Sequence, residues 1–190
     1  MKKLVVLTLS ALLLAVIQST AMADAHTSKI QAYVDSNIRG WSASEELHRA
    51  IYQQNLNHMG LTDSDINTLD QRWRAERRVG GGDLVSSKMD NDLSSFLRGI
   101  KAASNGVITE IFVMDNKGLN VGQTNGTGDY MQGDEAKWKK TFLVGAKAVF
   151  IDDVEQEDGI NISQTSLAVA RDNGYILGAV TVGFNVDALK

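Results

Sequence analysis

The sequence contains no cysteine and no proline, and acidic side chains outnumber basic ones by 23 to 19. Without cysteine the protein can form no disulfide, and it can use neither thiolate catalysis nor a thiolate metal site. Without proline, glycine and the Asn-Gly and Asp-Gly pairs must form the turns. The acidic balance argues against nucleic acid as a partner, because phosphates favour a basic face.

Residues 1–23 have the three parts of a secretory signal peptide. Lys2 and Lys3 form a basic start, an apolar run follows from Leu4 to Ile17, and Ala21-Met22-Ala23 fits the small-x-small cleavage pattern. The apolar run is shorter than the roughly 20 residues that a membrane-spanning helix needs. We therefore expect cleavage near Ala23 and export to the periplasm, with an uncleaved membrane anchor as the alternative.

Residues 24–104 are predicted to form the helical part of a single domain. Apolar side chains recur there at the intervals of helices, and the glycines lie where helices would end. The predicted helices lie around Ile30–Trp41, after a capping box formed by Ser42 and Glu45, over 62–79 and over 86–103.

Residues 105–190 are predicted to form an antiparallel sheet of five strands. The segments rich in β-branched and aromatic residues are 107–115, 119–124, 148–155, 160–170 and 175–185. Asn173-Gly174 is a strong hairpin signal, and strands that are joined by short turns must be antiparallel. With the helices of residues 24–104 packed on one face of the sheet, the fold class is α+β.

The polar segment 126–140, between the second and third predicted strands, holds most of the candidate functional residues. A long loop on a rigid scaffold often positions polar groups around a ligand. The alternative is a solvated connection in which Trp138 and Tyr130 only plug the sheet and Asp134 only caps a short helix over 134–142.

Three runs resemble one family of sensor domains. They are EIFVMDNKG (110–118), GLNVGQTNGTGDYMQGDEAKWKKTF (118–142) and ILGAVTVGFNV (176–186), and LDQRWRAE (69–76) resembles the helical part of small exported members. The family is the Cache or PDC family, a PAS-like module that lies outside the membrane in bacterial chemoreceptors, histidine kinases and diguanylate cyclases. The resemblance implies a PAS-like sheet with long N-terminal helices packed on it.

The resemblance also implies where a ligand binds, namely between the sheet and the loop and helix that follow the second strand. By position, the implied ligand-binding residues are Asp129, Tyr130, Gln132, Asp134, Trp138, Lys139, Ser163 and Thr165. The expected ligand is a small polar molecule, an organic acid or an amino acid, because these side chains offer hydrogen-bond donors, a cation and carboxylates, and a buried charge needs a partner.

The function that follows is that of a periplasmic sensor that is not an enzyme, needs no cofactor or metal, and assists a membrane-bound kinase, cyclase or chemoreceptor. The alternative is a structural or interaction protein that keeps the fold without a ligand and forms a homodimer through its N-terminal helices. A third hypothesis is an enzyme, or a haem or metal carrier, but no catalytic motif is present. The acidic residues 152–158 lack the spacing of an EF-hand, so exposure at a strand end is the expectation for them.

Overall fold

The computed structural model describes residues 26–157 and 159–189. The predicted signal peptide therefore lies outside the described residues. Within them, no helix is both long enough and apolar enough to cross a membrane.

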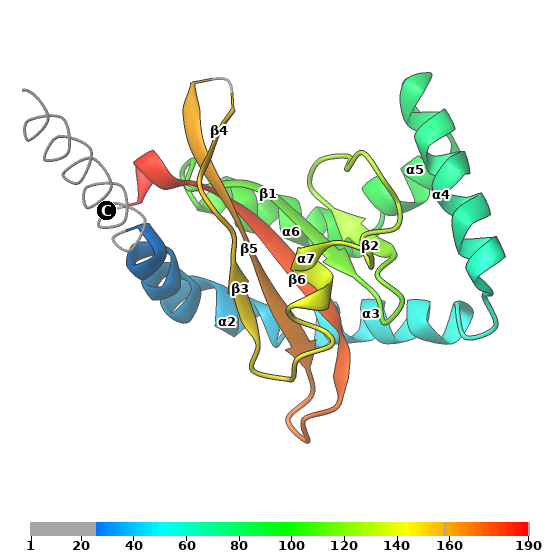
Figure 1. Ribbon diagram of the computed structural model, residues 1–190, viewed down its shortest axis with the longest axis horizontal. Helices are drawn as coiled ribbons and strands as arrows, with labels where there is room; N and C mark the ends of the chain where they lie inside the picture. The colour runs from blue at the N-terminus through cyan, green and yellow to red at the C-terminus, as the bar shows by residue number, and fades with distance from the viewer. Residues whose placement is uncertain (1–25, 158, 190) are drawn as a thin grey trace, which may run out of the picture.

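An antiparallel sheet of six strands forms the centre of the fold (Figure 1). The strand order is β2-β1-β6-β5-β3, and β4 also pairs with β5. The strands are β1 (Ile108–Met114), β2 (Asn120–Gln123), β3 (Val149–Ile151), β4 (Glu155–Glu157), β5 (Ile160–Ala170) and β6 (Ile176–Asn185). The predicted α+β class with an antiparallel sheet is thus confirmed.

The sixth strand arises because the predicted strand 148–155 is interrupted. The Oδ1 atom of Asp152 accepts the N–H of Asp153 at 3.0 Å, which takes that donor out of the ladder. Residues on either side, in β3 and β4, both pair with β5. The prediction of one continuous strand was therefore wrong.

The helices precede the sheet in the chain, apart from two short ones. Residues 26–33 are helical and continue into a π-helical turn. The elements are η1 (Val34–Ile38), α2 (Arg39–Ser42), α3 (Glu45–Asn57), α4 (Asp63–Arg78), α5 (Asp83–Met89), α6 (Asp92–Ala103), α7 (Ala136–Lys139) and η2 (Val186–Ala188).

Two predicted helix starts differ from the structure. Ser44, not Ser42, caps α3, because its side chain accepts the N–H of Leu47. The predicted helix 86–103 is divided into α5 and α6, since the side chain of Asn91 caps a new helix by accepting the N–H of Ser94. The helix start predicted at Thr62 is confirmed, and Thr62 and Asp65 form a capping box there.

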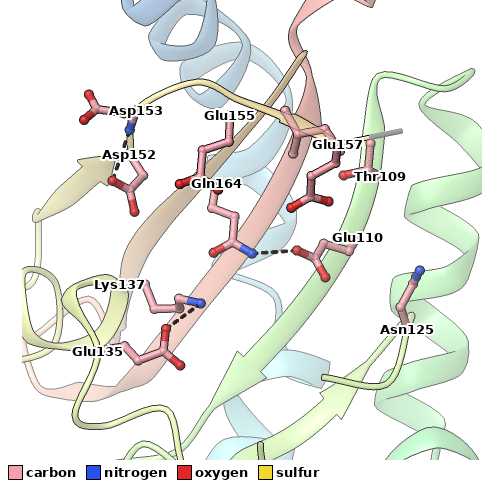
Figure 2. A pocket seen from close by; sticks show the side chains of 11 residues that line it. Thr109, Glu110, Asn125, Glu135, Lys137, Asp152, Asp153, Glu155, Glu157 and Gln164 are labelled. Carbon is pink, nitrogen blue, oxygen red and sulfur yellow. Dashed lines mark hydrogen bonds and ion pairs between the residues drawn. The ribbon is translucent and has the colours of Figure 1, made fainter. Parts of the chain in front are cut away.

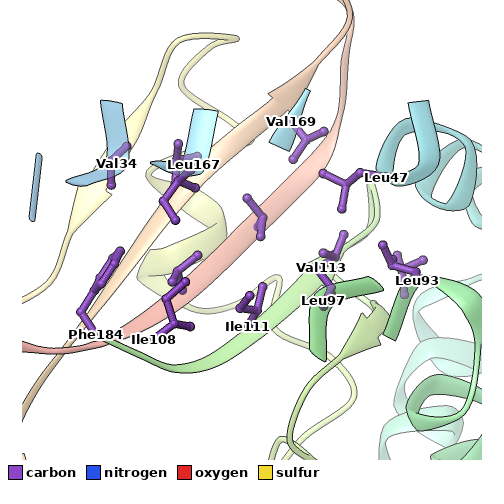
Figure 3. Packing of buried hydrophobic residues seen from close by; sticks show 14 of the residues in the cluster. Val34, Leu47, Leu93, Leu97, Ile108, Ile111, Val113, Leu167, Val169 and Phe184 are labelled. Atoms are coloured by element: carbon purple, nitrogen blue, oxygen red, sulfur yellow. The ribbon is translucent and has the colours of Figure 1, made fainter. Parts of the chain in front are cut away.

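One face of the sheet, the helix face, holds the main hydrophobic core (Figure 3). Leu47 from α3 and Leu97 from α6 pack there against alternate residues of the central strands, and all of them are buried. The strand residues of this cluster include Ile111, Val113, Leu167, Val169, Val180, Val182 and Phe184.

Residues 124–142, which we call the bridge, lead from β2 to the opposite face of the sheet, which we call the bridge face. In Figure 1, α7 lies across this face while α6 lies behind the sheet. Phe112, Met114 and Ala179 form a small buried cluster here with Trp138 packed against it. The helices α4 and α5 extend beyond the β2 edge of the sheet.

Candidate functional site

The bridge folds back along β2. Its backbone pairs with the β1–β2 connection, because the N–H of Asn120 donates to the carbonyl of Tyr130 at 3.1 Å and the N–H of Gln132 donates to that of Gly118 at 2.8 Å. Gly118 has a φ of 78°, and a Cβ atom there would lie only 2.3 Å from the Cα of Gly133. The close approach therefore requires glycine at this turn.

Helix α4 holds the other side of the bridge. The Oδ1 atom of Asp70 accepts the N–H groups of Tyr130 and Met131 at 2.9 and 3.0 Å. Trp73, fully buried, stacks on Tyr130 with 5.5 Å between ring centroids, and its Nε1 donates to the carbonyl of Thr127 at 3.0 Å. Arg74 pairs with Asp129 at 2.9 Å. The bridge is thus an ordered part of the domain that is attached to α4.

Tyr130 and Gln132 are both buried within this arrangement. Burial, with the nearby charge of Asp115 as a smaller cause, raises the pKa of the Tyr130 phenol, so the ring stays neutral. The side chain of Gln132 donates to the carbonyl of Asp129 at 3.1 Å. Both side chains therefore stabilise the conformation of the bridge in this structure.

Trp138 fills the middle of the bridge face. It packs against the cluster of Phe112, Met114 and Ala179, and its ring stacks on Phe142 with 4.7 Å between centroids. Its Nε1 donates to the carbonyl of Asp115 at 3.2 Å. This packing of Trp138 matches the alternative given by the sequence, in which Trp138 only plugs the sheet.

The remaining bridge residues that were predicted as ligands, Asp134 and Lys139, are exposed. Asp134 does not cap α7, because the N-cap residue is Glu135. Asp134 and Trp138 line a separate hollow between the bridge and α4.

Ser163 and Thr165 were predicted to bind a ligand beneath the bridge. Their side chains instead point toward the helix face of the sheet. They pair with Phe184 and Val182, whose side chains belong to the helix-face core. Side chains alternate along a strand, so Gln164 and Ser166 point toward the bridge instead. The hydroxyl of Ser166 is within 2.8 Å of that of Thr181 on this bridge face.

A hollow of about 340 Å³, the acidic hollow, lies on the bridge face beside α7 (Figure 2). Its walls come from β1, β5, the segment around β4, and the bridge. The residues that line it are Thr109, Glu110, Asn125, Glu135, Lys137, Asp152, Asp153, Glu155, Glu157, Ile162 and Gln164. The eight predicted ligand residues are not among them.

Gly183 of β6 makes room for the floor of the acidic hollow. It pairs with Glu110 on one side and with Gln164 on the other, so these two side chains meet across a residue that has none. The Nε2 atom of Gln164 donates to Oε1 of Glu110 at 2.7 Å, as Figure 2 shows. A Cβ atom at Gly183 would lie 2.8 Å from Cγ of Glu110.

The lining of the acidic hollow is strongly negative. Lys137 is its one cation, and the Nζ atom of Lys137 already pairs with Glu135 at 2.8 Å. Within the described chain, the lining carboxylates other than Glu135 form no ion pair. Such a concentration of one charge attracts ligands of the opposite sign.

In residues 26–157 and 159–189, no group of three or more His, Asp or Glu side chains is arranged to hold a metal ion. The carboxylates are instead spread over the walls of the hollow (Figure 2). Spread charges suit an extended organic cation better than a point charge.

Comparison with known proteins gives distant structural likenesses. No protein-family model and no curated protein sequence matches the chain. The sensor domain of the histidine kinase DctB of V. cholerae is 12% identical, with 90% of this chain and 59% of that chain covered and a TM-score of 0.39. The ligand-binding domain of the Campylobacter jejuni chemoreceptor Tlp3, in complex with L-valine, is 11% identical, with 86% and 64% covered and a TM-score of 0.40.

The E. coli DcuS sensor domain is 13% identical, with 76% of this chain and 96% of that chain covered and a TM-score of 0.39. The chain spans between 59% and 64% of the length of the first three matched structures. All three of these domains are sensor or ligand-binding domains of the proteins named.

Proposed function

We propose that the protein is a sensor domain that binds a small organic cation in the acidic hollow. The observation that supports the proposal is the lining, in which six residues carry carboxylates, four of them exposed in and before β4, and the one lysine is already paired. A volume of about 340 Å³ lies in the range of small-molecule sites, roughly 300–1,000 Å³. The floor consists of paired strands, and the bridge, which supplies Glu135 and Lys137, is attached to β2 and α4.

The negative charge of the lining disfavours one of the ligand classes that the sequence suggested, the organic acids. An organic acid without an ammonium group would bring a negative charge to carboxylates that already repel it. An amine or a diamine would pair with them. The first probe we therefore name is putrescine, a diamine that brings two positive charges to the carboxylates of the hollow.

The signalling role that we propose is accessory. The signal-peptide pattern supports export of the domain to the periplasm, and the resemblance implies a membrane-bound kinase, cyclase or chemoreceptor as its partner. The complex of the domain with its partner must then have two conformational states. Binding of the cation can shift the balance between these states only if they differ in their affinity for the cation.

Replacement of three lining carboxylates tests the site. We expect Asp153→Asn, Glu155→Gln and Glu157→Gln together to weaken putrescine binding about 100-fold, because each carboxylate contributes roughly 1 kcal/mol at about 4 Å in water. Isothermal titration calorimetry at low ionic strength measures the effect, which added salt should reduce.

The matched control is Asp90→Asn, since Asp90 is exposed and lies outside the acidic hollow. This variant should bind putrescine as the wild type does. Equal affinity of the triple variant and the wild type would refute the site. The absence of any thermal stabilisation by amines would refute the proposal as a whole.

A second candidate function is an interaction protein without a ligand. Trp138 and Phe142 fill the middle of the bridge face with the chain's own side chains, and this filling favours it. A protein that is silent to amines and that dimerises through its N-terminal helices in analytical ultracentrifugation would fit this candidate.

A further inference from the structure

Lys137 is the one cation among the residues that line the acidic hollow, and it belongs to the bridge. It is the second residue of α7, and its partner Glu135 is the N-cap residue of the same helix. The Nζ atom of Lys137 lies 2.8 Å from Oε2 of Glu135, and Figure 2 shows this pair on the bridge side of the hollow. A positive group of the chain itself therefore already pairs with one carboxylate of the proposed site.

A second contact helps to hold the Lys137 side chain in this position. Only 14% of the side chain is exposed, and its Nζ atom lies 5.3 Å from the centre of the Phe112 ring. Phe112 is itself buried in the small cluster of the bridge face. An ammonium over an aromatic ring is attracted by the negative face of the ring. The ammonium of Lys137 is therefore held at the hollow, where it competes with any cation that enters from outside.

The six carboxylates of the lining differ in their exposure to solvent. The four in residues 152–157 are exposed, whereas Glu110 and Glu135 are half-buried. Two opposite charges attract each other more strongly where less water surrounds them. Glu110 accepts a hydrogen bond from the neutral amide of Gln164, while Glu135 is paired with the ammonium of Lys137. A cationic ligand thus gains most at two carboxylates, and at one of them it meets Lys137.

We propose that Lys137 is a tethered competitor for the acidic hollow, and that a cationic ligand binds by replacing the Lys137 ammonium beside Glu135. This role rests on the function proposed above, because it concerns the ligand of the same site. Replacement exchanges one ion pair for another, so the net gain in affinity comes from a second positive group of the ligand, which pairs with the carboxylates of the strands. Replacement also breaks a contact within α7. Occupancy of the hollow is thereby connected to the conformation of the bridge.

Removal of the Lys137 ammonium should strengthen the binding of putrescine. Lys137→Met keeps the apolar stem of the side chain beside Phe112 and loses the charge, and we expect about 5-fold tighter binding, the upper range for an ion pair that is partly exposed. Isothermal titration calorimetry at low ionic strength measures the change. The matched control is Lys147→Met, since Lys147 is exposed and does not line the acidic hollow. This control removes the same charge and should bind putrescine as the wild type does.

A double-mutant cycle with Glu135→Gln separates replacement from a general effect of charge. Without the Glu135 carboxylate there is nothing for Lys137 to compete for, so Lys137→Met should change the affinity by less than about 2-fold in the Glu135→Gln background. If Lys137 acted only through its positive charge, the same gain would appear in both backgrounds. Thermal unfolding of each variant shows whether it is folded, and Lys137→Gln repeats the measurement with a polar side chain.

A crystal structure of the wild-type protein with putrescine provides a second readout, which does not depend on affinities. One ammonium of putrescine should lie within about 4 Å of the Glu135 carboxylate, and the Nζ atom of Lys137 should lie beyond that ion-pair distance. If putrescine occupied the hollow while Lys137 kept its pair with Glu135, the proposal would be overturned.

The results separate the role of Lys137 from the proposed function. If the wild type binds putrescine and Lys137→Met shows no gain, or the same gain in both backgrounds, the role of Lys137 is refuted and the proposed function stands. Binding by Lys137→Met but not by the wild type would support the role, because it would show that Lys137 blocks the hollow completely. Absence of binding in both proteins at millimolar putrescine would refute the role and the proposed function together.

Discussion

Replacement of Trp73 by alanine is expected to lower the free energy of unfolding by about 3–5 kcal/mol, the usual cost of removing a buried tryptophan. Trp73 is fully buried in the cluster that joins α4 to the bridge. The variant loses the stack on Tyr130 and the hydrogen bond to the carbonyl of Thr127. Urea unfolding followed by circular dichroism measures the change.

Trp73→Phe is the control for this prediction. It keeps an aromatic ring beside Tyr130 and removes the N–H that donates to Thr127, so a smaller loss is expected, with roughly 1 kcal/mol of it from the hydrogen bond. If the alanine variant were no less stable than the phenylalanine variant, the stack would not be what holds the bridge against α4.

The second large effect is expected at Asp115. Its carboxylate is fully buried and accepts four hydrogen bonds. Oδ1 accepts the N–H groups of Lys117 and Leu119 at 2.8 and 2.9 Å, and Oδ2 lies 3.0 Å from Nε2 of Gln54 and 2.8 Å from Nδ1 of His58. Asp115→Ala leaves these donors unpaired and should cost about 3 kcal/mol in the free energy of unfolding.

The conservative variant Asp115→Asn separates the two halves of this network. An asparagine oxygen can still accept the two backbone N–H groups of the β1–β2 turn, while the pairing with His58 loses its charge. We expect a loss between that of Asp115→Ala and zero. Equal losses for the two variants would show that the charge, rather than the turn, carries the stabilisation.

Asp115 also affects Lys88, a partly buried lysine of this region. Burial lowers the pKa of Lys88, and the negative charge of Asp115 opposes that shift. The Nζ atom of Lys88 donates to Oε1 of Gln54 at 2.7 Å, so the same side chain connects both charges. Neutralising Asp115 should therefore lower the pKa of Lys88 further.

The helical part and the sheet could be predicted because their side-chain periods are clear. The run from Ile30 to Ile38 and the alternation in residues 160–170 each bury one side of their element. The Asn173-Gly174 pair lies in the connection of β5 and β6, where Gly174 has a φ of 83°. The breaks at Asp153 and Asn91 were missed because each depends on a single side chain that bonds to the backbone.

The ligand residues were harder to predict, because the site depends on which face of the sheet each residue occupies. The sequence predicted that Ser163 and Thr165 point to one face of the sheet and Gln164 and Ser166 to the other. It did not predict which of these two faces the bridge covers. Glu110 shares a strand face with Phe112, and it meets Gln164 only because Gly183 lies between them. Contacts between residues 54 positions apart cannot be read from local periodicity.

The attachment of the bridge to Asp70 has a consequence for amide hydrogen exchange. Tyr130 and Met131 belong to a segment whose composition is that of a solvated loop, yet both of their N–H groups donate to one carboxylate from a distant helix. Their exchange with deuterium should therefore be as slow as that of β2 and should become fast only when α4 detaches. Protection at these two amides would report on the docking of α4 without any probe attached to the protein.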